Sequence, residues 1–363
     1  MKRYNKEELI LIWLDSFLGL EYKHKIEIYK YLKNAQKITE GLSQAKEYIQ
    51  SSVGQSEFNT LMNSANPNYL DYILNELDRK DIEVITIDSK EYPESLLNVE
   101  LKPLVLYYKG DIKLLNENGF AIVGSRKSLP LSFSLTRDYA KKLVKHFTLI
   151  TGIAEGVDSE VIRTALENHG KVISVVAGGL DNIYPSNNQS LADQVAKNGL
   201  LISEQPPKVA PKPYFFPIRN RIIAGLGKGV LIVSGGLKSG TLYTAEYAGE
   251  YGKDLFAIPY NVGVKSGEGC NELIKRGAIL TDTPKDILDF YRLEDKEQDV
   301  QLTDAEKDIV KALSVGQMHI EKLSAVLNKR TFEIMPTLSI LEIKGIVAKG
   351  GNVYELIRNY SEE

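Results

Sequence analysis

The stretch Phe120-Ala121-Ile122-Val123-Gly124-Ser125-Arg126-Lys127-Ser128 joins an apolar run to a glycine turn, and it sets the pattern for the middle of the chain. Four consecutive apolar residues are typical of a strand that is covered on both faces. A segment of helical character, 132–147, follows the turn. The stretch therefore predicts a strand–turn–helix unit of an α/β fold.

Apolar runs of the same kind recur on both sides of this stretch. They are Ile82–Ile87, Thr148–Ile150, Val172–Val176, Leu200–Ile202, Val230–Val233 and Leu255–Ile258. Helical segments such as 159–168 lie between them. This alternation predicts a doubly wound, mostly parallel sheet over residues 81–291, with ligands bound outside the carboxyl ends of the strands.

The two ends of the chain differ from this middle part. Residues 1–80 carry apolar residues at helical spacing and predict a small helical domain. Residues 292–301 are charged, lack a periodic apolar face and predict a linker. In residues 302–360, Thr303 to Glu306 form a capping-box pattern, further helices are expected at 320–327 and 331–344, and a terminal hairpin follows. This order of elements predicts a winged helix.

Composition narrows the class of protein. The chain has 363 residues, of which 43% are hydrophobic and 26% charged, which is typical of two or three globular domains. A net charge of −3 gives no global argument for a nucleic-acid or membrane partner. The single cysteine, Cys270, excludes an internal disulfide and is typical of a reducing cytoplasm. No apolar run is long enough to cross a bilayer, so a soluble cytoplasmic protein is expected.

Glycine-bearing turns follow four of the predicted strands. They are Gly124–Ser128, Gly152–Asp158, Gly178–Pro185 and Gly235–Thr241. Gly124, Ser125, Arg126 and Lys127 suit a phosphate, because free N–H groups and cations meet there. Ser239, Gly240 and Thr241 repeat this design before a second helix. None of these turns is a dinucleotide fingerprint or a Walker A loop, so no nucleotide cofactor is expected. The alternative to a phosphate site is that these are ordinary strand-to-helix turns, and that Asp158 only caps the helix that follows it.

The segment from Lys208 to Lys228 combines five basic residues with three aromatic ones and has no acidic residue. Its candidate contacts are Phe216, Arg219, Asn220 and Arg221. Cations that follow phosphates and rings that stack on bases are typical of single-stranded nucleic-acid binding. The alternative is that these aromatics belong to the core and the charges are merely solvated.

Residues for catalysis or metal binding are sparse in the sequence. The four histidines lack metal-ligand spacing, Cys270 has no partner for a zinc site, and no serine lies in a G-x-S-x-G elbow. Asp158, Glu204 and Glu246 are the few carboxylates near the expected ligand edge. The sequence therefore predicts neither a metal site nor a catalytic residue.

Taken together, these motifs resemble the DNA processing protein A (DprA, also called Smf) family of bacteria. The resemblance rests on Tyr92-Pro93, Val123 to Arg126, Gly152 to Asp158, Tyr184-Pro185, Ser203-Glu204, Phe216 to Leu226, Ser239 to Thr241, Gly269 and Asn271. It implies a helical SAM-like N-terminal domain, an extended Rossmann-like core and a C-terminal winged helix.

The resemblance also implies a function. Family members bind single-stranded DNA without catalysing a reaction, dimerise through the core and help load the recombinase RecA in natural transformation. Their DNA pocket uses the Gly-Ser-Arg turn, which corresponds to Gly124, Ser125 and Arg126. The expected partners are therefore single-stranded DNA, a RecA-type recombinase and a second copy of the chain.

The chain departs from the family pattern at Glu155, Ile162 and Ser234, so alternatives stay open. A nucleotide sensor or a phosphoribohydrolase-like enzyme is one, since Gly235-Gly236, Gly240-Thr241 and Glu246 are similar to the motif of such enzymes but carry extra residues between them. A regulator of duplex DNA is another, with 331–344 as its recognition helix, although basic charge is sparse along that helix.

Overall fold

The computed structural model describes residues 4–294, 302–344 and 346–356. The chain divides into two compact units, Met1–Asp295 and Lys296–Glu363. No helix in the described ranges is long and apolar enough to cross a membrane. Most of the linker predicted at 292–301 and the last residues of the predicted 302–360 domain lie outside the described residues.

A nine-stranded sheet forms the centre of the first unit. Its order is β1-β2-β6-β5-β4-β3-β7-β8-β9, and every pair from β6 to β9 is parallel. The strands are β1 (Glu83–Thr86), β2 (Val105–Gly110), β3 (Gly119–Val123), β4 (Thr148–Thr151), β5 (Val172–Val175), β6 (Leu200–Ser203), β7 (Gly229–Ile232), β8 (Asp254–Ala257) and β9 (Ile279–Leu280). The predicted mostly parallel α/β sheet is confirmed.

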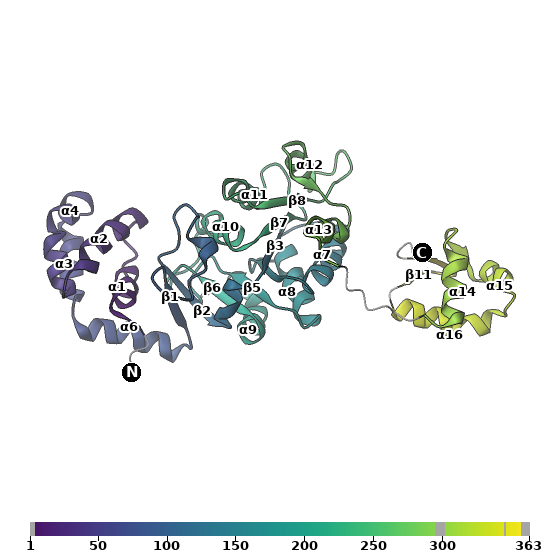
Figure 1. Ribbon diagram of the computed structural model, residues 1–363, viewed down its shortest axis with the longest axis horizontal. Helices are drawn as coiled ribbons and strands as arrows, with labels where there is room; N and C mark the ends of the chain where they lie inside the picture. Colours follow the sequence, from purple (N-terminus) through teal and green to yellow (C-terminus); the bar gives the residue numbers. More distant parts are fainter. Residues whose placement is uncertain (1–3, 295–301, 345, 357–363) are drawn as a thin grey trace. The chain divides into compact units, whose positions relative to one another are not determined.

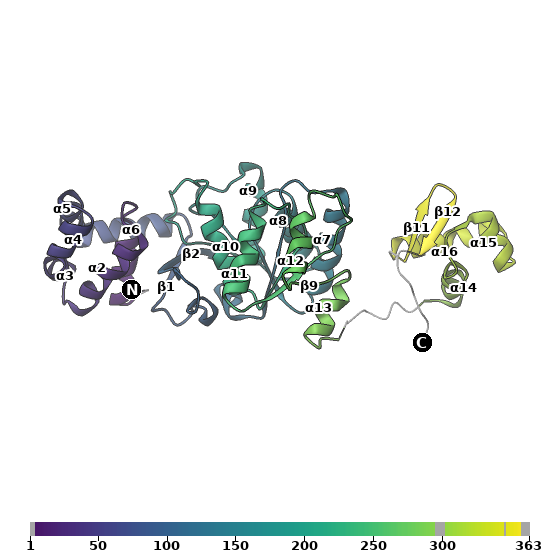
Figure 2. The ribbon, with the colours of Figure 1, turned by 90° about the horizontal axis from the view of Figure 1, so that it is seen from above.

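Helices cover both faces of this sheet, on the two sides seen in Figure 1. One face carries α7 (Pro130–Leu143), α8 (Val157–Glu167), α9 (Gln189–Asn198) and α13 (Pro284–Phe290). The other carries α10 (Phe215–Leu226), α11 (Thr241–Glu250) and α12 (Glu268–Lys275), which Figure 2 shows in a row. Along β3, Phe120 and Ile122 enter the first core and Ala121 and Val123 the second, as successive strand residues must. Short 3-10 turns are η1 (Glu94–Leu96), η2 (Ile112–Asn116) and η3 (Ser186–Asn188).

Six helices precede the sheet. They are α1 (Lys6–Asp15), α2 (Tyr22–Asn34), α3 (Ile38–Gln44), α4 (Lys46–Ser52), α5 (Gln55–Ser64) and α6 (Pro67–Arg79). Helix α1 is buried on two sides, because Trp13 and Leu14 join the core of these helices while Leu11 and Ile12 join the core of the sheet. An apolar surface all round a helix is typical of such a buried position. The helices therefore pack on the sheet and belong to the same unit.

The second unit contains three helices and a three-stranded sheet. These are α14 (Asp304–Leu313), α15 (Ile320–Leu327), α16 (Thr331–Ile343), β10 (Met318–His319), β11 (Val347–Gly350) and β12 (Val353–Leu356). The sheet order is β10-β12-β11, with both pairs antiparallel. The predicted capping box is confirmed, since the Glu306 N–H donates to the Thr303 hydroxyl and the Thr303 N–H to the Glu306 carboxylate.

The sequence reasoning missed strand β2. Its apolar run 104–108 lies between two irregular segments and has no following helix, so it did not fit the strand–helix alternation. In the structure β2 pairs antiparallel with both β1 and β6. This antiparallel edge extends the parallel part of the sheet toward the N-terminal helices.

Candidate functional site

A cleft opens at the point where the chain order of the sheet reverses. From β3 the chain proceeds through β4, β5 and β6 on one side, and then through β7, β8 and β9 on the other. Ligands of open α/β sheets bind at such a switch point, outside the carboxyl ends of the strands. Here a cleft of about 420 Å³ is lined by the turns after β3 and β7 and by the start of α10.

The structure brings together most of the residues predicted from the separate motifs. The cleft is lined by Val123, Gly124, Ser125, Arg126, Lys127, Ala154, Asp158, Phe216, Pro217, Arg219, Asn220, Ile223, Ser239, Gly240, Thr241 and Thr244. Of the predicted contacts, only Arg221 is missing from this set. Thr244 also lines the cleft, as expected from the hydroxyls of the turn before α11. Ala154, Pro217 and Ile223 were not predicted, because an apolar residue beside a motif carries no distinguishing signal in the sequence.

Two glycines hold the turn after β3 against helix α8. A Cβ on Gly124 would lie 2.6 Å from Cγ2 of Val157, so a larger residue does not fit there. Gly156 has φ +84°, and a Cβ on it would lie 2.5 Å from the carbonyl oxygen of Arg126. The backbone of the turn is thus fixed by close packing, while the side chains of Arg126 and Lys127 are exposed to solvent.

A pair of hydroxyl groups ties the same turn to strand β7. The Ser125 N–H donates to Oγ of Ser234 over 3.1 Å, and the hydroxyl oxygens of Ser234 and Ser128 are hydrogen-bonded at 2.6 Å. Ser234 is fully buried just beyond the end of β7. Ser234, one of the departures from the family pattern, therefore positions the Arg126 turn.

Arg126 and Phe216 form one side of the cleft, and the ring of Tyr184 contacts Phe216. The Cζ atom of Arg126 lies 4.9 Å from the centroid of the Phe216 ring. Tyr184 contacts Phe216 edge to face, with ring centroids 5.8 Å apart, and its side chain is exposed. Tyr184 was not among the predicted DNA contacts, although its place in the glycine turn Gly178–Pro185 could have suggested it. Guanidinium and ring faces beside an open cleft offer both a phosphate contact and a stacking surface.

Arg219 and Asp158 form a buried charged layer at the base of the cleft. Arg219 donates to the carbonyl oxygen of Val175, and a Cβ on Gly152 would lie within 2.7 Å of its guanidinium nitrogens. Burial lowers the pKa of Arg219 to about 10, although Asp158 favours its charge. Burial also raises the pKa of Asp158.

Asp158 has a different local role from the one predicted. The N-cap of α8 is Gly156, and the Asp158 carboxylate instead accepts hydrogen bonds from Thr151 Oγ1 at 3.1 Å and from Ala154 N at 3.2 Å. The prediction that Asp158 caps this helix is therefore wrong. Asp158 is the second residue of α8, two positions after the N-cap, and its carboxylate lines the cleft beside Arg219.

The turn before α11 forms the opposite side of the cleft. Ser239 Oγ donates to Thr241 Oγ1 over 3.1 Å, and the Thr241 N–H is 3.3 Å from Ser239 Oγ. The Asn220 side-chain amide donates to the carbonyl oxygen of Gly240 over 3.2 Å, which links α10 to this turn. The first N–H groups of α11 thus lie close to hydroxyl groups, an arrangement that suits an anion.

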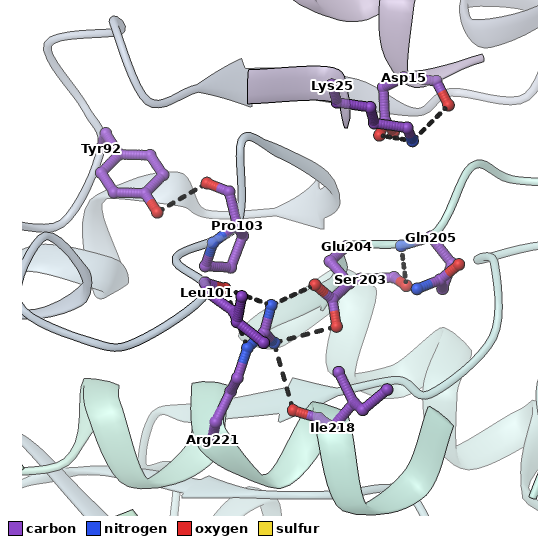
Figure 3. A network of polar contacts seen from close by, with 10 residues as sticks. All are labelled: Asp15, Lys25, Tyr92, Leu101, Pro103, Ser203, Glu204, Gln205, Ile218 and Arg221. Atoms are coloured by element: carbon purple, nitrogen blue, oxygen red, sulfur yellow. Dashed lines mark hydrogen bonds and ion pairs between the residues drawn. The ribbon is translucent and has the colours of Figure 1, made fainter. Parts of the chain in front are cut away.

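Arg221 does not line the cleft, and Figure 3 shows its side chain reaching from α10 to Glu204 and Leu101. Its guanidinium donates to both carboxylate oxygens of Glu204 and to the carbonyl oxygen of Leu101. The side chain is 4% exposed. Burial opposes its charge, but Glu204 keeps the pKa of Arg221 above its ordinary value. The structure therefore does not bring Arg221 into the cleft; it places this residue in a second cavity between the N-terminal helices and the sheet.

The remaining carboxylates do not contribute to the cleft. Glu155 and Glu246 are exposed and are not among its lining residues. Ile162 is fully buried in the core of the sheet. Within the described ranges, no group of three or more His, Cys, Asp or Glu side chains could hold a metal ion. The cleft thus combines cations, hydroxyls and an aromatic ring around one buried Asp–Arg layer.

Comparison with known proteins relates this cleft to a family. Protein Smf of Synechocystis sp. is 39% identical over 210 residues, which are 56% of this chain and 53% of that protein. DNA processing protein DprA of Bacillus subtilis is 37% identical over 225 residues, which are 61% of this chain and 74% of that protein. The chain thus spans about half the length of the first of these relatives and about three quarters of the second.

Two solved structures are similar as well. DNA processing protein A (DprA) from Streptococcus pneumoniae has a TM-score of 0.58 and 29% sequence identity, covering 74% of this chain and 98% of that one. DNA processing protein A from Helicobacter pylori, in a structure concerned with its single-stranded DNA binding mode, has a TM-score of 0.53 and 31% identity, covering 58% and 96%.

The model of the family described as DNA recombination-mediator protein A matches residues 83–292. This range contains the whole nine-stranded sheet and every residue of the cleft. Since the match covers more than half of the 363 residues, the chain belongs to the DNA recombination-mediator protein A family.

Proposed function

We propose that this protein binds single-stranded DNA in the cleft at the β3–β7 switch point and catalyses no reaction there. The proposed DNA-binding residues are Gly124, Ser125, Arg126, Lys127, Phe216, Arg219, Asn220, Ser239, Gly240 and Thr241. Arg221 binds Glu204 and Leu101 outside the cleft and is proposed to have a structural role. No cofactor or metal is required by this function.

The observation that carries the proposal is the stacking of Arg126 on Phe216 with Tyr184 beside it. A single strand presents a succession of phosphates and unstacked bases, so a guanidinium beside two rings could contact a phosphate and the neighbouring bases of the same strand. An inorganic anion would make no use of the rings. The exposed Arg126 and Lys127 supply cations for the backbone, and the rings supply stacking surfaces that accept every base.

Family membership supports a wider role in recombination. We propose that the protein protects incoming DNA and helps to load a RecA-type recombinase in natural transformation, acting as a homodimer in the cytoplasm. The family's description as recombination mediators and the single-stranded DNA binding of the Helicobacter pylori relative support this role.

The flanking regions also receive proposed identities. Residues 1–80 form a SAM-like helical domain, residues 81–291 a Rossmann-like DNA-binding core, and residues 302–360 a winged-helix domain. Three helices and a three-stranded antiparallel sheet in the second unit support the winged helix. The separate core of the N-terminal helices supports the first boundary.

The proposal is tested by titrating the full chain with labelled poly-dT and with a duplex of equal length over a series of salt concentrations. We expect preferential binding of the single strand and a linear fall of log K with log salt, because each neutralised phosphate releases counterions. Equal affinity for duplex, or no binding at low salt, would overturn the proposal. Release of free base from a nucleoside monophosphate, lost on changing Glu246, would instead support an enzyme.

A further inference from the structure

Helix α16 is apolar on two opposite sides. Ile334, Leu338 and Leu341 are at most 2% exposed and belong to the core of the second unit. On the other side Phe332 is 64% exposed and Ile343 86% exposed. A helix that is apolar all round is typical of one that is covered on all sides, but the residues described at 302–344 and 346–356 leave one side of α16 exposed.

The exposed apolar residues lie at regular helical intervals. Phe332, Met335, Pro336, Ser339, Ile340 and Ile343 are all exposed and follow one another by three, one, three, one and three residues. This spacing places them in one continuous stripe along the helix axis. We refer to these six residues as the α16 stripe.

The chemistry of the α16 stripe does not suit duplex DNA. Base edges in the major groove are read by Arg, Lys, Asn, Gln, Ser or Thr, and phosphates by cations. The stripe offers one serine and no cation, and acidic Glu333 and Glu342 flank it on its two sides. Continuous apolar stripes bordered by charges are typical of helix–helix contacts.

We propose that the α16 stripe pairs with the same stripe of a second copy of this chain, with the two helices antiparallel. The contact is distinct from dimerisation through the core, and it does not depend on DNA binding. In an antiparallel pair centred between Pro336 and Ser339, Phe332 of one copy faces Ile343 of the other, and Met335 faces Ile340. The small residues lie at the centre, where two helices must approach most closely, and the large ones fill the ends.

The charges beside the stripe complement one another in this pairing. Glu333 and Lys344 lie on the same flank of the helix, eleven residues apart in the sequence. With a rise of 1.5 Å per residue, Glu333 of one copy comes within about 3 Å, along the axis, of Lys344 of the other. Within its own chain the Nζ atom of Lys344 also binds Glu306 at 2.5 Å, so in this pairing the ammonium group is shared between the two carboxylates. Glu342, on the opposite flank, comes beside the N-terminus of the partner helix, where a negative charge is stabilised. A parallel pair would instead place the flank that carries Glu333 and Lys344 beside the Glu342 flank of the other copy, and Glu333 would not come near Lys344.

Disulfide cross-linking tests both the contact and its direction. The full chain is suited to this, because Cys270 is its only cysteine, is buried, and has a thiol pKa raised to about 12 by burial. Chains carrying Phe332→Cys and Ile343→Cys are mixed in equal amounts and oxidised mildly. Both positions are exposed, so the core of the unit is retained. Val315→Cys, at another exposed apolar position, is the matched control.

We expect the mixed Phe332–Ile343 dimer to form at least tenfold faster than any dimer that contains the Val315→Cys chain. Adding Met335→Glu to both chains should abolish this difference, because each carboxylate would be buried against Ile340 of the other copy without a partner. Cross-linking no faster than the Val315 control would overturn the pairing. Predominant Phe332–Phe332 dimers would overturn the antiparallel arrangement.

Discussion

The guanidinium of Arg221 binds the carboxylate of Glu204 through two parallel hydrogen bonds, of 3.0 Å from Nη1 and 2.6 Å from Nη2. Arg219, two residues earlier on the same helix, points into the cleft beside Asp158. Two residues of an α-helix are about 200° apart around its axis. Helix α10 therefore separates two charged layers, one at the candidate DNA site and one against the N-terminal helices, and the two arginines carry different roles.

Arg221→Met is expected to destabilise the first unit. It leaves the partly buried Glu204 carboxylate, which is 15% exposed, without its partner, and this costs up to about 3 kcal/mol. Urea unfolding followed by the fluorescence of Trp13, the only tryptophan, measures this loss. In the remaining folded protein the affinity for poly-dT should stay within twofold. Normal stability of Arg221→Met together with a loss of DNA binding would show that Arg221 contacts the strand. The double variant Arg221→Met, Glu204→Leu should recover the stability that Arg221→Met loses, because no carboxylate is then left without a partner.

Arg126→Ala is expected to weaken binding to single strands of every sequence. Removing one phosphate contact should also reduce the slope of log K against log salt by about 0.7. Arg276→Ala is the matched control, because Arg276 is an exposed arginine at the C-cap of α12 that pairs with Glu272. An unchanged salt slope for Arg126→Ala would remove this residue from the phosphate path.

Phe216→Leu is expected to lose the stacking of one base. This loss corresponds to about 1–3 kcal/mol of binding free energy, or roughly a five- to 150-fold increase in Kd. Phe216→Tyr keeps an aromatic face toward Arg126 and should bind within a few-fold of the parent chain. Fluorescence anisotropy with labelled poly-dT measures the affinity of both variants. Equal losses of affinity for Phe216→Leu and Phe216→Tyr would argue that Phe216 packs against its neighbours and does not stack on a base.

Ser234→Ala is expected to weaken DNA binding through the Arg126 turn. The variant removes the acceptor of the Ser125 N–H and the partner of the Ser128 hydroxyl. If Ser234 acts only by positioning Arg126, Ser234→Ala alone should lower the affinity for DNA several-fold. In an Arg126→Ala background the same substitution should cause no further loss of affinity. Additive losses in this double-mutant cycle would give Ser234 an independent role.

Acid is expected to loosen the second unit through Glu306. The Glu306 carboxylate accepts hydrogen bonds from Lys344 and from the Thr303 N–H, and these hold its pKa below the ordinary value. In the unfolded chain the pKa of the Glu306 carboxyl is about 4.3, and in the folded unit it is lower. The stability that the ionised carboxylate contributes is therefore fully present above about pH 4.3 and is lost as the pH falls through the pKa of the folded state.

This acid effect is measured by hydrogen exchange of α14 peptides in the full chain between pH 6 and pH 3. Protection corrected for the intrinsic exchange rate should fall in the parent chain below about pH 4.3. Glu306→Gln should be less protected at pH 6 and should show a flatter profile, because glutamine has no charge to lose. A parallel profile for both chains would assign the acid sensitivity to other carboxylates.

Much of the fold follows directly from the sequence. Strands of a parallel sheet are buried on both faces, so runs such as Phe120–Val123 and Val230–Val233 are apolar throughout and can be recognised without a structure. The capping box at Thr303 is equally local, since its partners are three residues apart. Glycine turns that follow parallel strands meet at one edge, which is why Gly124 and Gly240 could be assigned to a common site.

Other features required the tertiary structure. Strand β2 was missed because its antiparallel neighbours are distant in the sequence and leave no periodic signal. Ser128 and Ser234 are 106 residues apart, and only the pairing of β3 with β7 brings their hydroxyls together.

The two arginines of α10 show the same division between sequence and structure. In the sequence, Arg219 and Arg221 are equivalent cations. Helix geometry places them on opposite sides of α10. The packing of α10 then determines that Arg219 contacts Asp158 and Arg221 contacts Glu204. Residue types and local spacing therefore determined the elements and their turns. The partners of each charged side chain were decided by tertiary packing, because a charge is stabilised by the groups that surround it in space.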